Sequence, residues 1–593
     1  ASGRAASEAE FAHRVPLAPS LVGDVQLVAR ASSNAGVDAV AATIPVQSRL
    51  IEGRLTQVGW IDAQALDLRL PGLPEGAVTE SLELEVRHGV RGWLEGWLVD
   101  LRDYPHRCWE QSLTRALGAA VAVDAHEPEA FWPGAAALVE SVIADAPSFQ
   151  GEDGRFHYFL STHHWIGEGS PVLSAWTLRS FDRLRAMGYV VPKQMYAELE
   201  TAVQLDAVPP PDPGKDGRDW VHEWEIAAVA SGALAGSGRV RDDNLQRIWQ
   251  RWDRLSWHGR TELVRAMARA PALAARTGEG LALLRAAGHK RGLRQVIDDD
   301  RDFGYAMGSS LRDQCAVVAT LYELDASPAG EPQRQALLRG VADLYAGGTS
   351  SLDTQSSIHC VLAMQAAARK LPRDSAAGRE VQAILGTARQ ALALAADESP
   401  TTWRVPAPFT GDSLQLRGPE TVDPTLNFAA TINYNIDALA APAQATGLRL
   451  ERRYAVFREG KWRDLPDDGM REGEWVRVTL RVTVPAWRYF VAITDPVPGG
   501  LVTRDLALAG VGDAALRDAG DRGSWWFDSR QTGATDVRMY AESLPAGVHE
   551  VHYFAQAVHP GDYLAPPAVA ELMYGRSSRA TTSGQRLRIE AGQ

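Results

Sequence analysis

The sequence predicts a multidomain α+β protein in which a large helical domain separates two groups of strands. The 593 residues are too many for one hydrophobic core, and a prior of roughly 150 residues per domain suggests about three to five domains. A hydrophobic content of 45% and a charged content of 23% are ordinary for a globular protein. Strand-like, helix-like and again strand-like patterns follow one another along the chain.

The first block, from Val22 to about Val90, is strand-like. Apolar residues alternate with polar ones, and Gly and Pro separate the runs 22–33, 49–60, 66–74 and 81–89. We expect residues 1–45 to be the end of a preceding β-sandwich domain or a linker, and 46–90 to be the first part of a β-domain. The first residues have no basic head followed by an apolar core, as a signal peptide would, and no initiator methionine. We therefore expect either a removed signal or a piece of a longer chain.

The second block, residues 91–396, is helix-like. Apolar residues recur at steps of three and four, and many runs end in Gly or precede Pro. The runs are 115–125, 131–146, 170–189, 225–238, 262–275, 280–293, 316–326, 335–348, 357–370 and 381–396. Their even spacing and short connections predict stacked helical hairpins that close into an α/α toroid.

Strands return after Thr402 and continue to the C-terminus. The runs 425–437, 449–457, 475–485, 489–498, 537–545 and 547–558 are typical of an antiparallel sandwich. We assign 397–440 to the second part of the β-domain and 441–593 to a C-terminal β-sandwich. Two arrangements remain open: the strands on both sides of the toroid form one domain into which it is inserted, or three units follow one another in a row.

Charge and cysteine content argue against several classes of binding site. A net charge of -13 argues against a nucleic-acid surface and against direct contact with a membrane. Three cysteines make no disulfide framework, and their spacing fits no zinc motif. Cys315 and Cys360 lie in apolar helical runs and are expected to be buried, unreactive thiols. His163 and His164 lack a third ligand at suitable spacing, so we expect no metal and no cofactor.

Cys108 and Gln111 carry the most informative chemistry. In "DYPHRCWEQSLTRAL" (103–117) the cysteine stands near the head of a helix-like run. If the helix begins just after Pro105, residues i and i+3 share a face and the helix terminus favours the thiolate. Attack of the thiolate on the amide carbon would expel ammonia and leave an internal thioester, which an amine or a hydroxyl could later open. The alternative is a buried free cysteine beside two surface residues.

Four stretches resemble one family in the right order. "YPHRCWEQSLTRAL", which contains Cys108, Trp109, Glu110 and Gln111, resembles the thioester motif of bacterial alpha-2-macroglobulins and, more distantly, of complement thioester proteins. The other three stretches are similar to later blocks of the same family: "FQGEDGRFHYF…HHWIGEGSPVLSAWTL", "VRVTLRVTVP…YFVAITDPVPGGL" and "FAQAVHPGDYLAPPAVAELMYGRSSR".

The resemblance implies a fold and a function. The helical toroid would be a thioester domain inserted in a CUB-type β-sandwich, and 441–593 a macroglobulin-like β-sandwich. The chain would be the C-terminal part of a broad-range endopeptidase inhibitor that serves in bacterial defence. Cleavage of an upstream bait segment would expose the thioester, which would capture a lysine of the protease covalently. The implied partners are target proteases and upstream macroglobulin domains, and we expect a periplasmic or extracellular monomer, possibly anchored by lipid through its missing N-terminus.

The resemblance also assigns roles to neighbours of the bond. Tyr104 and Met573 match family residues that pack over the thioester and shield it from water. His222 lies in the region where some complement relatives carry a histidine that attacks the bond, with a structural role as the alternative. Trp109 and Ser112 depart from the usual aliphatic residue and threonine, and Trp109 could change how tightly the site is covered.

Two other functions compete with the trap. Helical toroids also house glycoside hydrolases and terpene cyclases, and Asp298, Asp299, Asp300 and Asp302 would then be an acidic cluster, although a solvated turn is the simpler interpretation. The chain could also be a scaffold whose thioester is absent or spent. Trp525 and Trp526 are expected to pack within the last domain.

Overall fold

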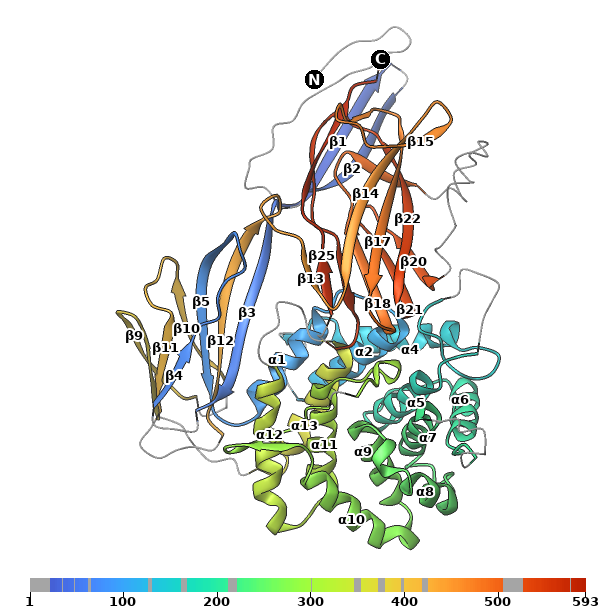
Figure 1. Ribbon diagram of the computed structural model, residues 1–593, viewed down its shortest axis with the longest axis vertical. Coiled ribbons are helices and arrows are strands. Elements are labelled where there is room, and N and C mark those ends of the chain that lie inside the picture. Colours follow the sequence, from blue (N-terminus) through green and yellow to red (C-terminus); the bar gives the residue numbers. More distant parts are fainter. Residues whose placement is uncertain are drawn as a thin grey trace.

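In the computed structural model, one β-domain lies beside a ring of helices and another lies above it (Figure 1). The structure describes residues 22–592 apart from 35, 47, 62–64, 126–130, 161–167, 212–220, 300, 346–352, 372–378, 396–398, 419–424, 505–525 and 576–577. Among the described helices, none is long and apolar enough to cross a bilayer. The α+β, multidomain class predicted from the sequence is confirmed.

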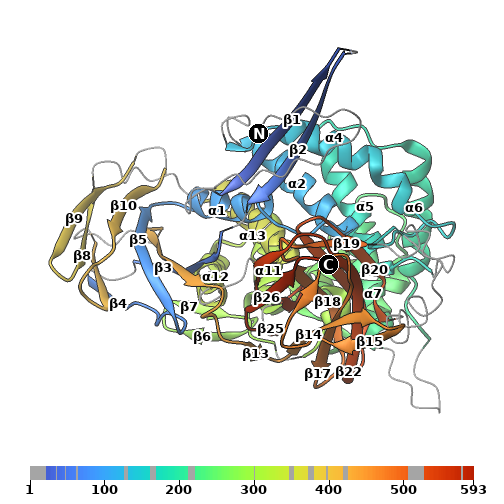
Figure 2. The same ribbon diagram turned by 90° about the horizontal axis from the view of Figure 1, so that it is seen from above.

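A two-stranded hairpin precedes the first domain. β1 (Gly23–Ser33) and β2 (Gly36–Val46) pair antiparallel along their whole length and, among the described strands, form a sheet of their own. Figure 2 shows the hairpin projecting away from the rest of the molecule. Three of its valines are exposed, Val28 at 55%, Val37 at 76% and Val40 at 65%. The hairpin therefore presents apolar side chains on which nothing in the described chain packs fully.

The β-domain is a sandwich of two four-stranded sheets, in the orders β10-β5-β12-β3 and β4-β11-β8-β9. Its strands are β3 (Leu50–Trp60), β4 (Ala65–Arg69), β5 (Ala77–Arg87), β8 (Glu380–Leu385), β9 (Ala388–Ala393), β10 (Thr401–Pro406), β11 (Ser413–Arg417) and β12 (Asn427–Asp437). β5 lies between β10 and β12, so strands from both sides of the helical block share a sheet. The inserted arrangement is therefore confirmed, and the arrangement of three units in a row is wrong.

The helix expected over 381–396 is wrong. Residues 380–393 form the β8–β9 hairpin, which turns at Gly386 with a positive φ of 56°. Val381, Ala383 and Leu385 alternate inward into the core between the two sheets. Alanine- and leucine-rich runs satisfy helical and strand periodicities at once, and here the sheet edge of β11 decided the outcome. The β-domain thus resumes before residue 397.

The helical domain is a closed double ring. Six inner helices pack each on the next, and α13 packs back on α2. They are α2 (Trp109–Ala125), α5 (Pro171–Ala186), α7 (Val221–Ala233), α9 (Trp257–Met267), α11 (Ser310–Leu324) and α13 (Thr354–Ala368). The outer helices are α1 (Arg91–Arg102), α4 (Ala135–Asp145), α6 (Lys193–Asp206), α8 (Asp242–Trp249), α10 (Ala274–Arg285) and α12 (Glu331–Tyr345). A short hairpin of β6 (His289–Arg291) and β7 (Arg294–Val296) follows α10. The predicted toroid is confirmed.

The two cysteines expected to be inert thiols form a disulfide. Cys315 on α11 and Cys360 on α13 are bonded, with Cα atoms 4.8 Å apart. The sequence separation of 45 hides the pairing, because only the stacking of successive hairpins makes α11 and α13 neighbours. The expectation of free thiols is therefore wrong, and the bond ties together two inner helices, of which α13 packs on α2.

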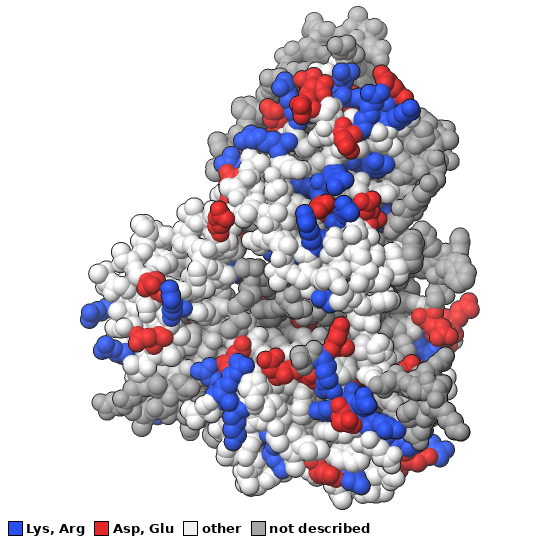
Figure 3. Space-filling view, viewed as in Figure 1, with Lys and Arg blue, Asp and Glu red and all other residues white. Residues whose placement is uncertain are grey.

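The last domain is a β-sandwich with a separate core. Its larger sheets have the orders β13-β25-β24-β18-β21-β20 and β15-β14-β17-β22-β19, and β16-β26-β23 closes one end. The strands are β13 (Gln444–Thr446), β14 (Arg449–Arg458), β15 (Lys461–Asp464), β16 (Met470–Arg471), β17 (Trp475–Val484), β18 (Arg488–Pro496), β19 (Leu501–Arg504), β20 (Ser529–Thr532), β21 (Asp536–Leu544), β22 (Gly547–Ala557), β23 (Gly561–Ala565), β24 (Val569–Leu572), β25 (Arg579–Thr581) and β26 (Gln585–Glu590). On the face seen in Figure 3, basic and acidic side chains are interspersed over this domain and the helical domain.

Candidate functional site

The first turn of α2 brings Cys108 and Gln111 together. The helix begins at Trp109, later than the sequence suggested, and Cys108 is its N-cap because the Ser112 amide donates to the Cys108 carbonyl at 2.9 Å. The Cys108 amide in turn donates to Gln111 Oε1 at 3.0 Å. This is the backward half of a capping box, in which the third residue of the helix reaches back to the cap. Cys108 has no disulfide, and both side chains are buried, at 1% and 0% exposure.

Trp109 anchors the start of α2 rather than covering the pair. Its ring is fully buried and lies 5.1 Å from both Phe149 and Phe156, centroid to centroid. The indole N–H donates to Thr177 Oγ1 on α5 at 3.0 Å. These contacts all lie within the helical domain. The indole therefore fixes the direction in which the first turn of α2 presents Cys108 and Gln111.

Glu110 is a fully buried carboxylate with four donors. Its Oε1 accepts from Thr114 at 2.6 Å and from Gln355 at 2.7 Å, and its Oε2 accepts from Thr354 at 2.8 Å and from Tyr574 at 2.6 Å. Burial raises the pKa of Glu110, and these hydrogen bonds oppose that rise. Because Tyr574 belongs to the last domain, Glu110 joins that domain to the first turn of α2.

The two residues expected to shield the bond are buried at the domain junction. Tyr104 is 4% exposed, and its hydroxyl lies 3.5 Å from Gln111 Nε2. Met573 is 2% exposed, and its amide donates to the Phe490 carbonyl at 2.7 Å. Met573 belongs to the same hydrophobic cluster as Cys108, although it directly follows β24 of the last domain. The last domain thus contributes apolar groups to the core around Cys108.

Sequence reasoning missed Phe490 and Tyr158. The pairing of β18 with β21 passes over Phe490, which has a positive φ of 53°, an unfavourable backbone conformation for a bulky residue. Its ring lies across the junction, 4.8 Å from Tyr158 and 5.0 Å from Tyr574. The Tyr158 carbonyl accepts the Trp109 amide at 2.8 Å. No sequence signal predicts the positive φ of Phe490, but Tyr574 could have been found beside Met573.

Polar contacts surround the apolar junction. His106 Nε2 lies 3.6 Å from Glu571 Oε1, and Arg579 lies 3.5 Å from the other carboxylate oxygen. Burial alone would raise the pKa of Glu571, but the hydrogen bond from His106 and the charge of Arg579 lower it overall. Arg538 donates to the Pro105 carbonyl at 2.8 Å. These contacts hold the 104–108 loop against β21, β24 and β25.

The expected thiolate is not favoured in this closed arrangement. Burial raises the pKa of the Cys108 thiol well above its ordinary value, and the charge of Glu110 raises it further. Interactions with the backbone amide of Gln111 and with the Tyr574 hydroxyl lower this pKa, but their effect is smaller than that of burial. The expectation based on the helix terminus is wrong because desolvation outweighs the field of one helix end.

His222 does not contact the Cys108–Gln111 pair. It is the second residue of α7, its side chain is exposed, and its ring stacks on Tyr305 at 3.7 Å between centroids. His163 and His164, which were weighed above as metal ligands, lie outside the described residues, as does Trp525. Trp526 makes an edge contact with His549 of the last domain, 5.8 Å between centroids.

The aspartates considered for an enzyme are engaged within their own loop. Asp299 pairs with Arg301 at 2.6 Å, and Asp302 accepts the Gly304 amide at 2.8 Å. Asp298 lies 3.9 Å from Arg291, and Asp300 lies outside the described residues. Nowhere in the described ranges do three or more His, Cys, Asp or Glu side chains form a group that could hold a metal ion. The contacts of Asp299 and Asp302 stabilise the loop between β7 and α11.

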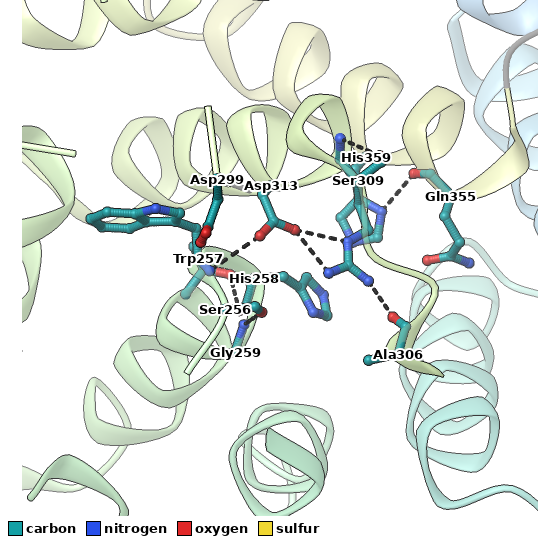
Figure 4. Close-up of polar contacts among 12 residues, drawn as sticks. Ser256, Trp257, His258, Gly259, Asp299, Ala306, Ser309, Asp313, Gln355 and His359 are labelled. Atoms are coloured by element: carbon teal, nitrogen blue, oxygen red, sulfur yellow. Dashed lines mark hydrogen bonds and ion pairs between the residues drawn. The ribbon is translucent and has the colours of Figure 1, made fainter. Parts of the chain in front are cut away.

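A second polar cluster fills the axis of the toroid (Figure 4). The ring centroids of His258 and His359 lie 5.1 Å apart, and His258 lines a cavity of about 10 Å3, room for about one water molecule. Burial lowers the pKa of both imidazoles well below the ordinary value, and the charge of Arg312 adds to this. Arg312 pairs with Asp313 at 2.8 Å, and Asp313 accepts the Trp257 amide at 3.1 Å. The cluster joins the N-terminal ends of α9, α11 and α13.

Glu542 provides a pH test of the junction. Burial and the nearby Asp528 raise the pKa of Glu542 to about 7. The folded state therefore binds a proton between pH 4.5 and 7 that the unfolded chain has released, so this group lowers stability as pH rises through that window. We expect Glu542→Gln to raise the melting temperature at pH 8 by about 2–4 °C and to leave it unchanged near pH 4.5. Melting curves of both proteins across this range, with exposed Glu550→Gln as control, test it; parallel curves would contradict it.

Comparison with known proteins agrees with the resemblance. The family model described as "Bacterial Alpha-2-macroglobulin MG10 domain" matches residues 447–575. An alpha-2-macroglobulin homolog from Nostoc sp. is 26% identical over 175 residues, which are 28% of this chain and 9% of that protein.

Solved structures share the fold of nearly the whole chain. Native alpha-2-macroglobulin from Escherichia coli, from domain MG7 to the C-terminus, has a TM-score of 0.73 and 19% identity over 96% of this chain and 88% of that one. Salmonella alpha-2-macroglobulin reacted with methylamine has a TM-score of 0.68 and 18% identity, over 96% of this chain and 36% of that one. The predicted resemblance to the C-terminal part of bacterial alpha-2-macroglobulins is confirmed. The chain spans about a third of the Salmonella structure.

Proposed function

We propose that this chain is the thioester-bearing C-terminal part of a protease-trapping inhibitor of the alpha-2-macroglobulin type. The observation that carries the proposal is the Cys108 amide donating to Gln111 Oε1 at 3.0 Å, in a pair that is at most 1% exposed. The capping contact holds the side-chain amide of Gln111 beside the cysteine on one face of the first turn. Attack of the sulfur on Gln111 Cδ expels ammonia and leaves the thioester.

The acyl group is then available to a nucleophile. A neutral lysine amine of a protease attacks the former Gln111 carbonyl carbon, a C–N bond forms, the C–S bond breaks and Cys108 leaves as a thiol. The burial of the pair in the closed molecule keeps water from hydrolysing the bond. Reaction with a protein lysine therefore requires the last domain to move away, as would follow bait cleavage elsewhere in the full protein.

The partners and location follow from the same proposal. Val37 and Val40 are among the apolar residues exposed on the β1–β2 hairpin. Strands of upstream macroglobulin domains would pair with this hairpin and cover them. The Cys315–Cys360 disulfide suits an oxidising compartment, either the periplasm or the cell exterior. We propose a monomer there, with target proteases as covalent partners.

Intact mass with thiol counting tests the function. We expect a mass short by one ammonia in addition to the disulfide, and no free thiol in the denatured protein under non-reducing conditions. Methylamine should then add one equivalent at Gln111 and release the Cys108 thiol, as the Salmonella structure was made by reaction with methylamine. Cys108→Ala should show neither the deficit nor the addition. A mass without the ammonia deficit, with Cys108 free from the start and Gln111 intact, would contradict the trap and support the scaffold function instead.

A further inference from the structure

Tyr574 lies between the carboxylate and the sulfur of the thioester motif. It is 4% exposed, and its hydroxyl donates to Glu110 Oε2 at 2.6 Å. The same hydroxyl also acts on the Cys108 thiol, because its interaction lowers the pKa of that thiol against the larger effect of burial. A polar atom of the last domain therefore acts on both Glu110 and Cys108.

Removal of the last domain changes one contact of Glu110. Thr114, Thr354 and Gln355 all belong to the helical domain and stay with the carboxylate. Only the Tyr574 hydroxyl leaves, so Oε2 keeps Thr354 and gains an open acceptor position on the side of Cys108. The N-terminal ends of α2 and α13 face this carboxylate and favour its ionised form.

We propose that Glu110 is the general base of the acyl transfer, and that the Tyr574 hydroxyl holds the position of the attacking nitrogen until the last domain moves away. This inference rests on the proposed thioester. The neutral amine donates one N–H to Glu110 Oε2 and attacks the acyl carbon. As the C–N bond forms, the proton passes from nitrogen to Oε2, and as the C–S bond breaks it passes from Oε2 to the Cys108 sulfur. Glu110 ends ionised, as it began.

The electrostatics of the site make a proton carrier useful. Burial raises the pKa of the Cys108 thiol well above its ordinary value, so the sulfur is a poor leaving group unless it receives a proton. Burial also raises the pKa of Glu110, which makes it a better proton acceptor from the amine. The titratable groups near Glu110 include Tyr104, Tyr158 and Tyr574, and burial raises the pKa of each well above its ordinary value. The carboxylates Asp353, which caps α13, and Glu571 also act on Tyr104, so the profile of Glu110→Gln is needed to assign a titration in acid to Glu110.

The experiment compares amine reactivity in the whole chain. The rate of thiol release with methylamine is measured for the wild type, Glu110→Gln and Tyr574→Phe, after intact mass has established the ammonia deficit in each. We expect Glu110→Gln to react about 10²-fold more slowly. Tyr574→Phe keeps the ring but frees Oε2, and should react several-fold faster. Glu223→Gln, an exposed acid at the start of α7, is the matched control and should react like the wild type.

A pH profile separates catalysis from positioning. With a weakly basic amine such as methoxyamine, the rate is corrected for the unprotonated fraction of the amine. The corrected wild-type rate should fall in acid as Glu110 is protonated, whereas that of Glu110→Gln should stay level. A structural role would lower the rate without changing this profile.

The outcomes distinguish this inference from the proposed function. No ammonia deficit in the wild type overturns the thioester itself. A deficit with equal rates and equal profiles in wild type and Glu110→Gln overturns only the role of Glu110. If Glu110→Gln lacks the bond, the wild-type profile decides: a fall in acid supports the general base, and a level profile overturns it. An unchanged or slower Tyr574→Phe overturns the role given to its hydroxyl.

Discussion

Tyr104→Ala is expected to lose its thioester to water during purification. Tyr104 is 4% exposed and places its hydroxyl 3.5 Å from Gln111 Nε2, while its ring meets the edge of His106 at 5.6 Å between centroids. Alanine would leave a space with several polar groups at its wall, which water can fill. Because a thioester persists only where water is excluded, we expect hydrolysis to accelerate about tenfold or more.

Intact mass of freshly purified protein measures this effect. The wild type should show the ammonia deficit, and Tyr104→Ala should have regained one water, with glutamate at position 111 and Cys108 free. Tyr104→Phe is the matched control, because it keeps the ring and loses only a long contact at 3.5 Å, so its bond should persist. A stable deficit in Tyr104→Ala over days would show that other groups exclude water from the bond.

The site could be predicted from sequence where its geometry is local. Cys108 and Gln111 are three residues apart, so one helical turn was enough to bring them together. Tyr104 precedes them in the same loop. Phe490 reaches Tyr158 and Tyr574 from a backbone position with a positive φ of 53°, and Thr354 and Gln355 donate to Glu110 only because the ring of helices closes on α2. Such contacts depend on tertiary closure, which no periodicity encodes.

The fold shows the same division. Even spacing of helical runs predicted the toroid, because each hairpin packs on its neighbour in sequence. The β8–β9 hairpin was mistaken for a helix, since its small apolar residues fit both periods and pairing with β11 lies outside the local sequence. The Cys315–Cys360 bond was missed for a related reason: 45 residues separate two helices that are adjacent in the ring.

Arg452→Met is expected to destabilise the last domain by about 3–5 kcal/mol, because it leaves a buried carboxylate without its cation. Arg452 on β14 pairs with Asp495 on β18 at 2.6 Å, and the two side chains are 1% and 0% exposed. Asp495 also accepts the Tyr553 hydroxyl at 2.9 Å, so the pair links the two larger sheets. Burial raises the pKa of Asp495, so partial protonation would relieve some of this cost.

The double variant Arg452→Met/Asp495→Asn gives the decisive sign. Asparagine removes the buried charge and can still accept from Tyr553, so the double variant should be more stable than Arg452→Met alone. Hydrogen exchange of β14 and β18 peptides in increasing urea follows this domain separately from the other two. Arg449→Met on the same strand is the control, because the Arg449 side chain is 70% exposed and its replacement should change stability little.

Since β18 carries Phe490 and β24 leads to Met573, loosening this domain should also speed methylamine entry at Cys108. A double variant less stable than Arg452→Met would show that the pair acts through packing rather than charge.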